Sequence, residues 1–208
     1  MGKTLTELRA LVASDLADAG NALWSTDELD RAIRKALYAY SWVRPREAEA
    51  TIEAADGREY DLTGLAGLMD VQRVWWPYEA GEEPRWQPFE VWGNGRVLFL
   101  RSAEQPKTGD GPLRVFYGAV QTMGGLDGAA ESTYPDEDEE TLVLGATAYA
   151  AVQRARYVVE NVNPSADTPD DWAEWGRARL REFERALWEI ARVGNTARGA
   201  WVTVELEV

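Results

Sequence analysis

The side chains that could do chemistry in this chain are carboxylates, lysine, tyrosine and serine, because its 208 residues contain no histidine and no cysteine. Without them there is no disulfide, thiol nucleophile, imidazole base or ordinary zinc or copper site. None of the patterns GxGxxG, GxxxxGK[ST] and GxSxG occurs. Paired carboxylates can hydrolyse glycosides, but a chain with 36 acidic residues does not reveal which two would lie close together. We therefore predict no catalytic residue, no cofactor and no metal ligand.

The densest group of carboxylates is the run Asp136-Glu137-Asp138-Glu139-Glu140. Such a run can attract Ca²⁺, but it lacks the D-x-[DN]-x-[DN]-G loop that would enclose the ion. Acidic residues also favour the first turn of a helix, where they face the positive end of the helix dipole. This second interpretation is the one that we prefer.

Aromatic residues gather in one short segment, which holds Trp75, Trp76, Tyr78, Trp86, Phe89 and Trp92. Adjacent Trp75 and Trp76 point to opposite faces of a regular strand, so one can join a core while the other is exposed or covered by something else. Three interpretations stay open: a two-layer core, a protein–protein interface, and a platform on which sugars stack. For contacts between subunits we select Trp76 and Trp92.

The segment WVTVELEV at 201–208 alternates with the period of a β-strand that has one buried face. Its backbone groups need partners if that face is buried. The segment could pair with a sheet edge of its own chain, or it could add to another subunit or another protein. We predict the second, with these partner-binding residues: Trp201, Val202, Val204, Leu206 and Val208.

Helical patterns stand at both ends of the chain. A first helix is expected over 4–19, with a capping box of Thr4 and Glu7 and a stop at Gly20. A second has Ser25 as its N-cap and Glu28 as the partner three residues later, and it ends before Pro45. Two more follow, one from the acidic run at 136–140 and one from Thr168 to Gly194, with an inner face of Trp172, Trp175, Phe183, Leu187 and Ile190.

Between the helical parts the period changes to that of strands. Asp56-Gly57 predicts a hairpin within 51–62, and Asn94-Gly95 predicts another within 89–100. Residues 71–78 and 113–120 read as further extended segments. Five or six short strands in this region predict a small antiparallel sheet or sandwich.

The expected fold is therefore α+β and mainly α: a four-helix core with an inserted small antiparallel β domain and an extended C-terminal tail. We place the helical domain at 1–47 with 136–194, the β domain at 48–121, a Gly/Ala-rich connector at 122–135, and the tail at 195–208. Packing all four helices together is the economical arrangement, because two separate domains would leave each helix pair with half a core.

The net charge and the distribution of apolar residues indicate which classes of partner the chain is not expected to bind. The formal net charge is −14, from 36 acidic and 22 basic residues, so the chain is not expected to hold nucleic acid through its phosphates. No apolar run reaches the roughly 20 residues that span a bilayer, and the N-terminus lacks the apolar core of a signal peptide. No membrane partner is predicted.

Four stretches together give the chain a resemblance to the head–tail connector (adaptor, or neck) proteins of tailed bacteriophages. They begin with Leu5 to Pro45, which carries the W-S-x-x-E-L helix entry and the proline exit. Then come YDLTGLAGLMDVQRVWWP from Tyr60, LFLRSAEQPKTGDGPLRVFYGAVQT from Leu98 and LVLGATAYAAVQRA from Leu142. They cover most of 5–156 and contain no catalytic signature.

This resemblance implies a structural virion protein in the neck, between capsid and tail, assembled in the cytoplasm of the host bacterium. Its implied partners are the portal protein above it, a stopper or tail protein below it, and copies of itself in a ring, commonly twelvefold. DNA would pass through the ring without specific binding, and an acidic channel wall would repel phosphates. The resemblance implies no enzyme.

Two other functions compete with this one. The tryptophans Trp75, Trp76, Trp86 and Trp92 are also compatible with a carbohydrate-binding module or a carboxylate-based glycosidase. A small chaperone or regulatory module with an inserted sheet is the third hypothesis.

Overall fold

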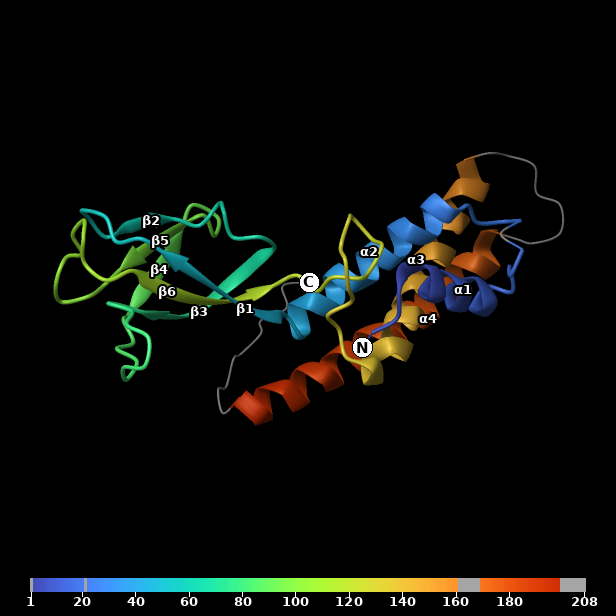
Figure 1. Cartoon of the computed structure of the whole chain (residues 1–208). Helices are drawn as coiled ribbons and strands as arrows, with labels where there is room; N and C mark the ends of the chain where they lie inside the picture. Colours follow the sequence, from blue (N-terminus) through green and yellow to red (C-terminus); the bar gives the residue numbers. More distant parts are fainter. Residues whose placement is uncertain (1, 21, 161–168, 199–208) are drawn as a thin grey trace. The chain divides into compact units, whose positions relative to one another are not determined.

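A computed structural model describes residues 2–20, 22–160 and 169–198 of the chain. The chain forms two compact units, one of residues 1–44 with 121–208 and one of residues 45–120. The first unit is helical and the second is made of strands (Figure 1). From the sequence we placed the β domain at 48–121, and the observed unit spans 45–120.

The described residues contain four α-helices, and the predicted α+β class is confirmed. They are α1 (Leu5–Asp15), α2 (Thr26–Val43), α3 (Glu139–Glu160) and α4 (Pro169–Arg198), with a short 3₁₀ helix, η1 (Asp136–Asp138), before α3. Among the described helices, none is both long and apolar enough to cross a membrane.

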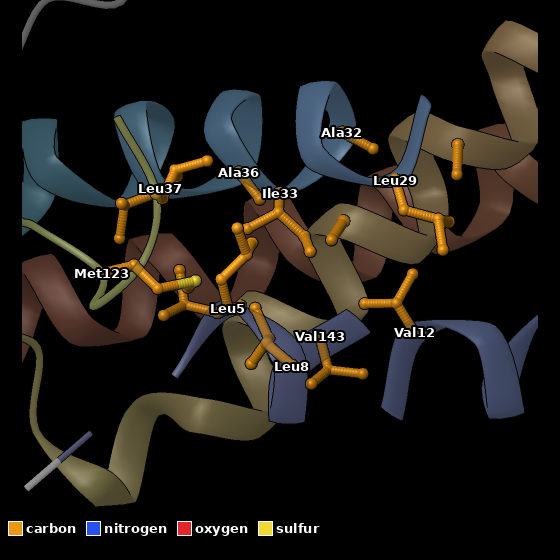
Figure 2. Close-up of a cluster of buried hydrophobic side chains, with 14 of the residues drawn as sticks. Leu5, Leu8, Val12, Leu29, Ala32, Ile33, Ala36, Leu37, Met123 and Val143 are labelled. Carbon is orange, nitrogen blue, oxygen red and sulfur yellow. The ribbon is translucent and has the colours of Figure 1, made fainter. Parts of the chain in front are cut away.

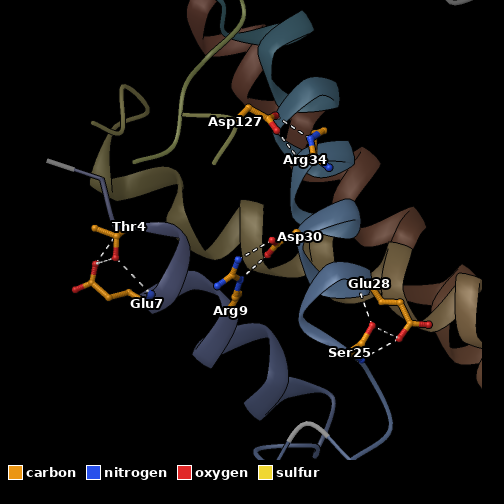
Figure 3. Close-up of polar contacts among 8 residues, drawn as sticks. All are labelled: Thr4, Glu7, Arg9, Ser25, Glu28, Asp30, Arg34 and Asp127. Carbon is orange, nitrogen blue, oxygen red and sulfur yellow. Dashed lines mark hydrogen bonds and ion pairs between the residues drawn. The ribbon is translucent and has the colours of Figure 1, made fainter. Parts of the chain in front are cut away.

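Both predicted capping boxes are present (Figure 3). Thr4 N–H donates to Glu7 Oε2 at 2.8 Å, and Ser25 N–H donates to Glu28 Oε2 at 2.8 Å. In return each hydroxyl accepts from the backbone N–H of the glutamate at 3.4 Å. These bonds satisfy N–H groups that the first helical turn leaves open, so each helix begins where the sequence predicts.

Two predicted helix ends are wrong. α1 ends at Asp15 rather than at Gly20, because Ala17 takes a left-handed conformation with φ of 54° and Asp18 N–H closes the last turn on Ala13 O at 2.8 Å. α4 runs through Gly194 to Arg198. A single glycine weakens a helix by about 1 kcal/mol, which a helix of 30 residues tolerates.

One buried apolar cluster joins the four helices (Figure 2). Apolar residues at helical spacing on α1 and α2 form a stripe on each helix and supply much of it, and Leu8, Val12, Leu29 and Ile33 are all nearly inaccessible to solvent. On α4, Phe183 is buried in the same cluster, while the other predicted inner-face residues pack against it as partly buried side chains: Trp172, Trp175, Leu187 and Ile190.

Arg34 on α2 and Asp127 in the connector form a bidentate pair, with N–O distances of 2.8 and 2.6 Å (Figure 3). Arg9 on α1 pairs with Asp30 on α2 in the same two-bond geometry. Bidentate pairs of this kind add geometric specificity to helix packing. The two pairs link α2 to α1 and to the connector, both of which also contribute residues to the apolar cluster.

Helices α3 and α4 pack closely where Gly145 on α3 faces Phe183 on α4. A Cβ atom added at Gly145 would lie 2.6 Å from Phe183 Cε2 and 2.7 Å from Cζ. The ring is buried at 1% exposure and is met edge-on by Tyr149, so an added Cβ would force a shift within a packed core. A glycine is required here because the backbone itself forms the surface on which the ring rests.

We expect Gly145→Val to destabilise the helical unit by about 2–3 kcal/mol, because overpacking a filled core forces side chains out of their rotamers. The measurement is urea unfolding followed by circular dichroism at 222 nm. Gly20→Val is the matched control, since an added Cβ there meets nothing within 4 Å. Equal unfolding midpoints for the two variants would contradict the close contact.

Asp18 organises the chain between α1 and α2. Its carboxylate accepts backbone hydrogen bonds from Ala22 at 2.8 Å and from Leu23 and Trp24 at 2.9 Å. Burial of the carboxyl acts to raise its pKa, but the three N–H donors outweigh this effect, and the pKa lies below the ordinary aspartate value. The charged form of Asp18 therefore stabilises the fold.

This depressed pKa predicts a pH dependence. A carboxyl whose pKa is lower in the folded state contributes stability above its unfolded pKa, about 3.9, and that contribution is lost as the pH falls through the folded pKa. We expect Asp18→Asn to lower the unfolding temperature at pH 7, and the difference from the parent protein to shrink below about pH 4. Asp15→Asn, at an exposed position of α1, is the control and should show no such trend.

The β unit contains two three-stranded antiparallel sheets. Sheet A has the order β1-β6-β3, from β1 (Arg46–Ile52), β6 (Leu113–Ala119) and β3 (Leu68–Trp75). Sheet B has the order β2-β5-β4, from β2 (Glu59–Asp61), β5 (Val97–Leu100) and β4 (Phe89–Trp92). Residues of both sheets meet in a second apolar cluster, which includes Val74, Leu98, Leu100, Leu113 and Val115.

Of the two predicted hairpins, the one within 89–100 is confirmed. β4 and β5 pair directly, and Gly93, Asn94 and Gly95 all have positive φ in the turn between them. The hairpin within 51–62 is wrong, because β1 pairs with β6 and β2 pairs with β5. The Asp56-Gly57 turn instead bonds to a distant loop, through Thr108 N–H to Asp56 Oδ1 and Gly57 N–H to Pro106 O.

Candidate protein-contact surfaces

Trp75 and Trp76, at the end of β3, are both buried, with 8% and 5% of their surfaces exposed. They lie on opposite sides, as a regular strand requires. Trp76 belongs to the apolar cluster between the sheets, whereas Trp75 is covered by other aromatic rings. This corrects the selection of Trp76 for contacts between subunits: its ring lies in the core of the β unit and not on its surface.

The cover of Trp75 is an aromatic group on the outer face of sheet A. Trp75 meets Tyr78 at 4.7 Å and Trp86 at 6.4 Å between ring centroids, and Trp86 meets Phe116 at 5.6 Å. Two guanidinium groups lie against these rings, Arg73 over Trp86 at 5.4 Å and Arg114 over Tyr78 at 4.9 Å. Such contacts hold the rings in place. With Trp75 and Trp76 both buried, the sugar-platform interpretation loses two of its four rings.

Trp92 stands on the outer face of sheet B, at the end of β4. Its ring stacks on Phe99 with 4.5 Å between centroids and an interplanar angle of 16°, and its Nε1–H donates to Glu90 at 3.2 Å. The side chain is still 43% exposed. The structure thus places this predicted contact residue on the surface, with its orientation fixed by two neighbours.

The helical unit also exposes large apolar side chains, and the sequence analysis did not select them. Tyr38 and Trp42, four residues apart on α2, meet edge-on at 6.2 Å and are 51% and 61% exposed. On α4, Trp188 is 61% exposed. Their positions fall outside the apolar stripes of their helices, and this was the available signal in the sequence. Exposed aromatic rings in such positions are typical of protein contacts.

Acidic residues of the run at 136–140 form hydrogen bonds and ion pairs with other residues of the same chain. Asp138 accepts from Tyr40 Oη at 2.5 Å and from Arg44 Nη1 at 2.6 Å, and Glu139 pairs with Lys3 at 3.0 Å. In residues 2–20, 22–160 and 169–198, no three acidic side chains are grouped so as to hold a metal ion. The acidic run thus lies at the N-terminal end of α3 and pairs with residues of the same chain.

The remaining predicted contact residues, Trp201, Val202, Val204, Leu206 and Val208, lie outside the residues that the structure describes. The interpretation of 201–208 as a strand therefore stays a prediction from the sequence.

No family model matches the chain, and neither does any curated protein with which it was compared. Among solved structures, it is similar to the neck of an empty GTA particle computed with C6 symmetry, at 17% identity and a TM-score of 0.32. That likeness covers 81% of this chain and 87% of the other. It is also similar to the neck of a native GTA particle computed with C12 symmetry, at 18% identity and a TM-score of 0.32, over 85% of this chain and 91% of the other.

Proposed function

We propose that the chain is a structural protein of a tailed phage or phage-like particle, an adaptor in the neck that binds beneath the portal as a ring. In this role it extends the DNA channel and provides the platform for a stopper or tail protein. The ring is commonly twelvefold in the connector proteins that the sequence resembles. The protein acts by binding other proteins and carries out no reaction.

One observation carries the proposal: both units expose large aromatic side chains, Trp42 and Trp188 in the helical unit and Trp86 and Trp92 in the β unit. Tryptophan is enriched at protein–protein interfaces, so each unit offers side chains suited to a partner surface. A ring subunit needs several such surfaces, because it contacts neighbours on two sides and other proteins above and below.

Charge supports the passage of DNA without binding. With a net charge of −14, the chain repels a phosphate backbone over the range that salt screening allows, about 8 Å at physiological ionic strength. A channel that grips DNA would slow its passage, so a net acidic subunit suits a conduit.

Analytical ultracentrifugation tests the proposal. The chain is sedimented alone and with the portal protein of the same particle, and we expect a monomeric or weakly associated species alone and co-sedimentation with the portal in the mixture. A chain that remains separate from the portal at all concentrations overturns the adaptor role. In the same protein, a shift of tryptophan emission on titration with host polysaccharide would favour the carbohydrate-binding alternative instead.

A further inference from the structure

Strand β4 is an edge strand of sheet B in the described part of the chain, since the sheet order is β2-β5-β4. Arg101 N–H donates to Pro88 O at 2.8 Å and Arg96 N–H to Trp92 O at 3.0 Å, which fixes the phase of the ladder with β5. In an antiparallel pair the bonded residues alternate. The backbone groups of Phe89 and Val91 therefore point away from β5, toward the open edge.

The side chains of β4 suit an apolar partner. Val91 lies opposite Leu98 on the core side of the sheet and is 37% exposed, and Trp92 extends from the other face. The charge of Glu90 is compensated by an ion pair with Arg101. An exposed edge with open backbone groups and apolar side chains is a template for one more strand.

The other edges of the β unit are less suited to a strand that carries acids. Neither β1 nor β2 exposes a large apolar side chain, and exposed Glu59 and Asp61 flank the buried residue of β2. Like charges directly opposite each other destabilise a strand pair. β3 has two register shifts against β6, and part of its edge bonds to residues 85–87 through Trp76 N–H to Arg85 O and Gln87 N–H to Val74 O.

The chain itself contains a segment of the required kind. In 201–208, Val202, Val204, Leu206 and Val208 alternate with Trp201, Thr203, Glu205 and Glu207. Added to β4, which is four residues long, such a strand would set two of its four apolar residues beside Phe89 and Val91 and two residues of its other face beside Glu90 and Trp92. Among these edges β4 is the matching one, because it exposes large apolar side chains and β1 and β2 expose none.

We propose that residues 201–208 of a second copy of the chain add to the β4 edge as a strand. This inference rests on the proposed ring. The donor segment and the acceptor edge are different patches, so each subunit donates one strand and accepts one, and contacts of this heterologous kind close into a ring when the rotation allows it. Pairing within one chain would occupy both patches and leave neither for a neighbour.

Complementation between two variants tests the proposal. Val91→Pro removes an N–H that points to the open edge and leaves the bonds to β5 in place, because proline is tolerated on that side of an edge strand. A second variant lacks residues 199–208. We expect each variant alone to associate at least tenfold more weakly than the parent chain, and their mixture to form a heterodimer, since one supplies the strand and the other the edge.

Val91→Thr is the matched control, because it keeps the N–H and the branched shape and should associate within about threefold of the parent chain. Circular dichroism and thermal melting check that the β unit of Val91→Pro is folded. A parent chain that associates no more tightly than the variant lacking 199–208 overturns the proposal.

Cross-linking gives a readout that does not depend on the proline variant. The parent chain has no cysteine, so single-cysteine chains Val91→Cys and Val204→Cys can be mixed and oxidised. We expect a disulfide-linked heterodimer, and none when Val91→Cys is replaced by Glu104→Cys in an exposed loop. A chain with both Val91→Cys and Val204→Cys that forms the disulfide only within itself overturns the second-copy assignment.

Failure of this inference differs from failure of the proposed function. A chain without 199–208 that still forms a ring on the portal would remove the strand exchange and leave the adaptor role. A tail-dependent dimer from a chain that never joins a portal would do the reverse.

Discussion

Trp24→Ala is expected to lower the free energy of unfolding of the helical unit by about 3–5 kcal/mol, the usual range for removing a buried tryptophan. Trp24 is 2% exposed and meets Trp172 of α4 edge-on at 5.1 Å. Its Nε1–H donates to Ala150 O of α3 at 3.3 Å. Because it stands at the entry of α2, one side chain links three helices, and its loss leaves a cavity that they share.

Trp24→Phe separates the contribution of the buried apolar volume from that of the indole hydrogen bond. Phenylalanine keeps most of the apolar volume but leaves the carbonyl of Ala150 without the indole donor, so we expect a loss of only about 1–2 kcal/mol. Both variants are measured by urea unfolding at 222 nm, with Trp188→Ala as a control at an exposed ring of α4. A Trp24→Ala protein no less stable than Trp188→Ala would show that the ring is not a shared contact.

The helices were predictable because their signals are local. Thr4 with Glu7, and Ser25 with Glu28, are each three residues apart, and the bonds that they form are determined within one helical turn. The same is true of the Gly93–Gly95 turn, whose backbone conformation demands particular residues. Sequence patterns of this range carry their own geometry and need no tertiary information.

Long-range pairing was not predictable in the same way. The chain does bend at Asp56-Gly57, where Gly57 has a positive φ. The strands on either side, β1 and β2, pair with β6 and β5, which lie far along the chain. The burial of Trp75 likewise depends on Trp86 and Tyr78, which the sequence marks only as nearby aromatic residues. Local patterns determine that strands form, whereas loop connections and side-chain packing determine which strands meet.

Whether each candidate contact residue is buried or exposed also could not be predicted from local sequence patterns. Exposure of Trp92 and burial of Trp76 follow from which face of each strand is covered by the other sheet, and alternation alone gives the two faces without saying which is covered. Tyr38 and Trp42 were detectable in principle, since they fall off the apolar stripe of a helix whose start and period were both predicted correctly.

The second large effect is expected at Asp138, where Asp138→Ala should destabilise the helical unit by about 2–3 kcal/mol. The carboxylate has 9% of its side-chain surface exposed and accepts hydrogen bonds from Tyr40, which is 98 residues away in sequence, and from Arg44. Burial, together with the bond to Asp138, raises the pKa of Tyr40, so its hydroxyl stays a donor at neutral pH and also where an exposed tyrosine would ionise. Without Asp138 that buried donor has lost its acceptor, whereas Arg44 can be hydrated because 41% of its side-chain surface is exposed.

A double-mutant cycle isolates the tyrosine–carboxylate contact. Tyr40→Phe removes the hydroxyl, so Asp138→Ala in that background should cost less than in the parent chain, with a coupling of about 1–2 kcal/mol. Glu137→Ala is the control, because Glu137 also bonds Arg44, at 3.3 Å, but its side chain is 68% exposed and such pairs contribute about 0–1 kcal/mol. A coupling near zero would mean that Asp138 holds α2 through Arg44, at the C-cap of the helix, and not through Tyr40.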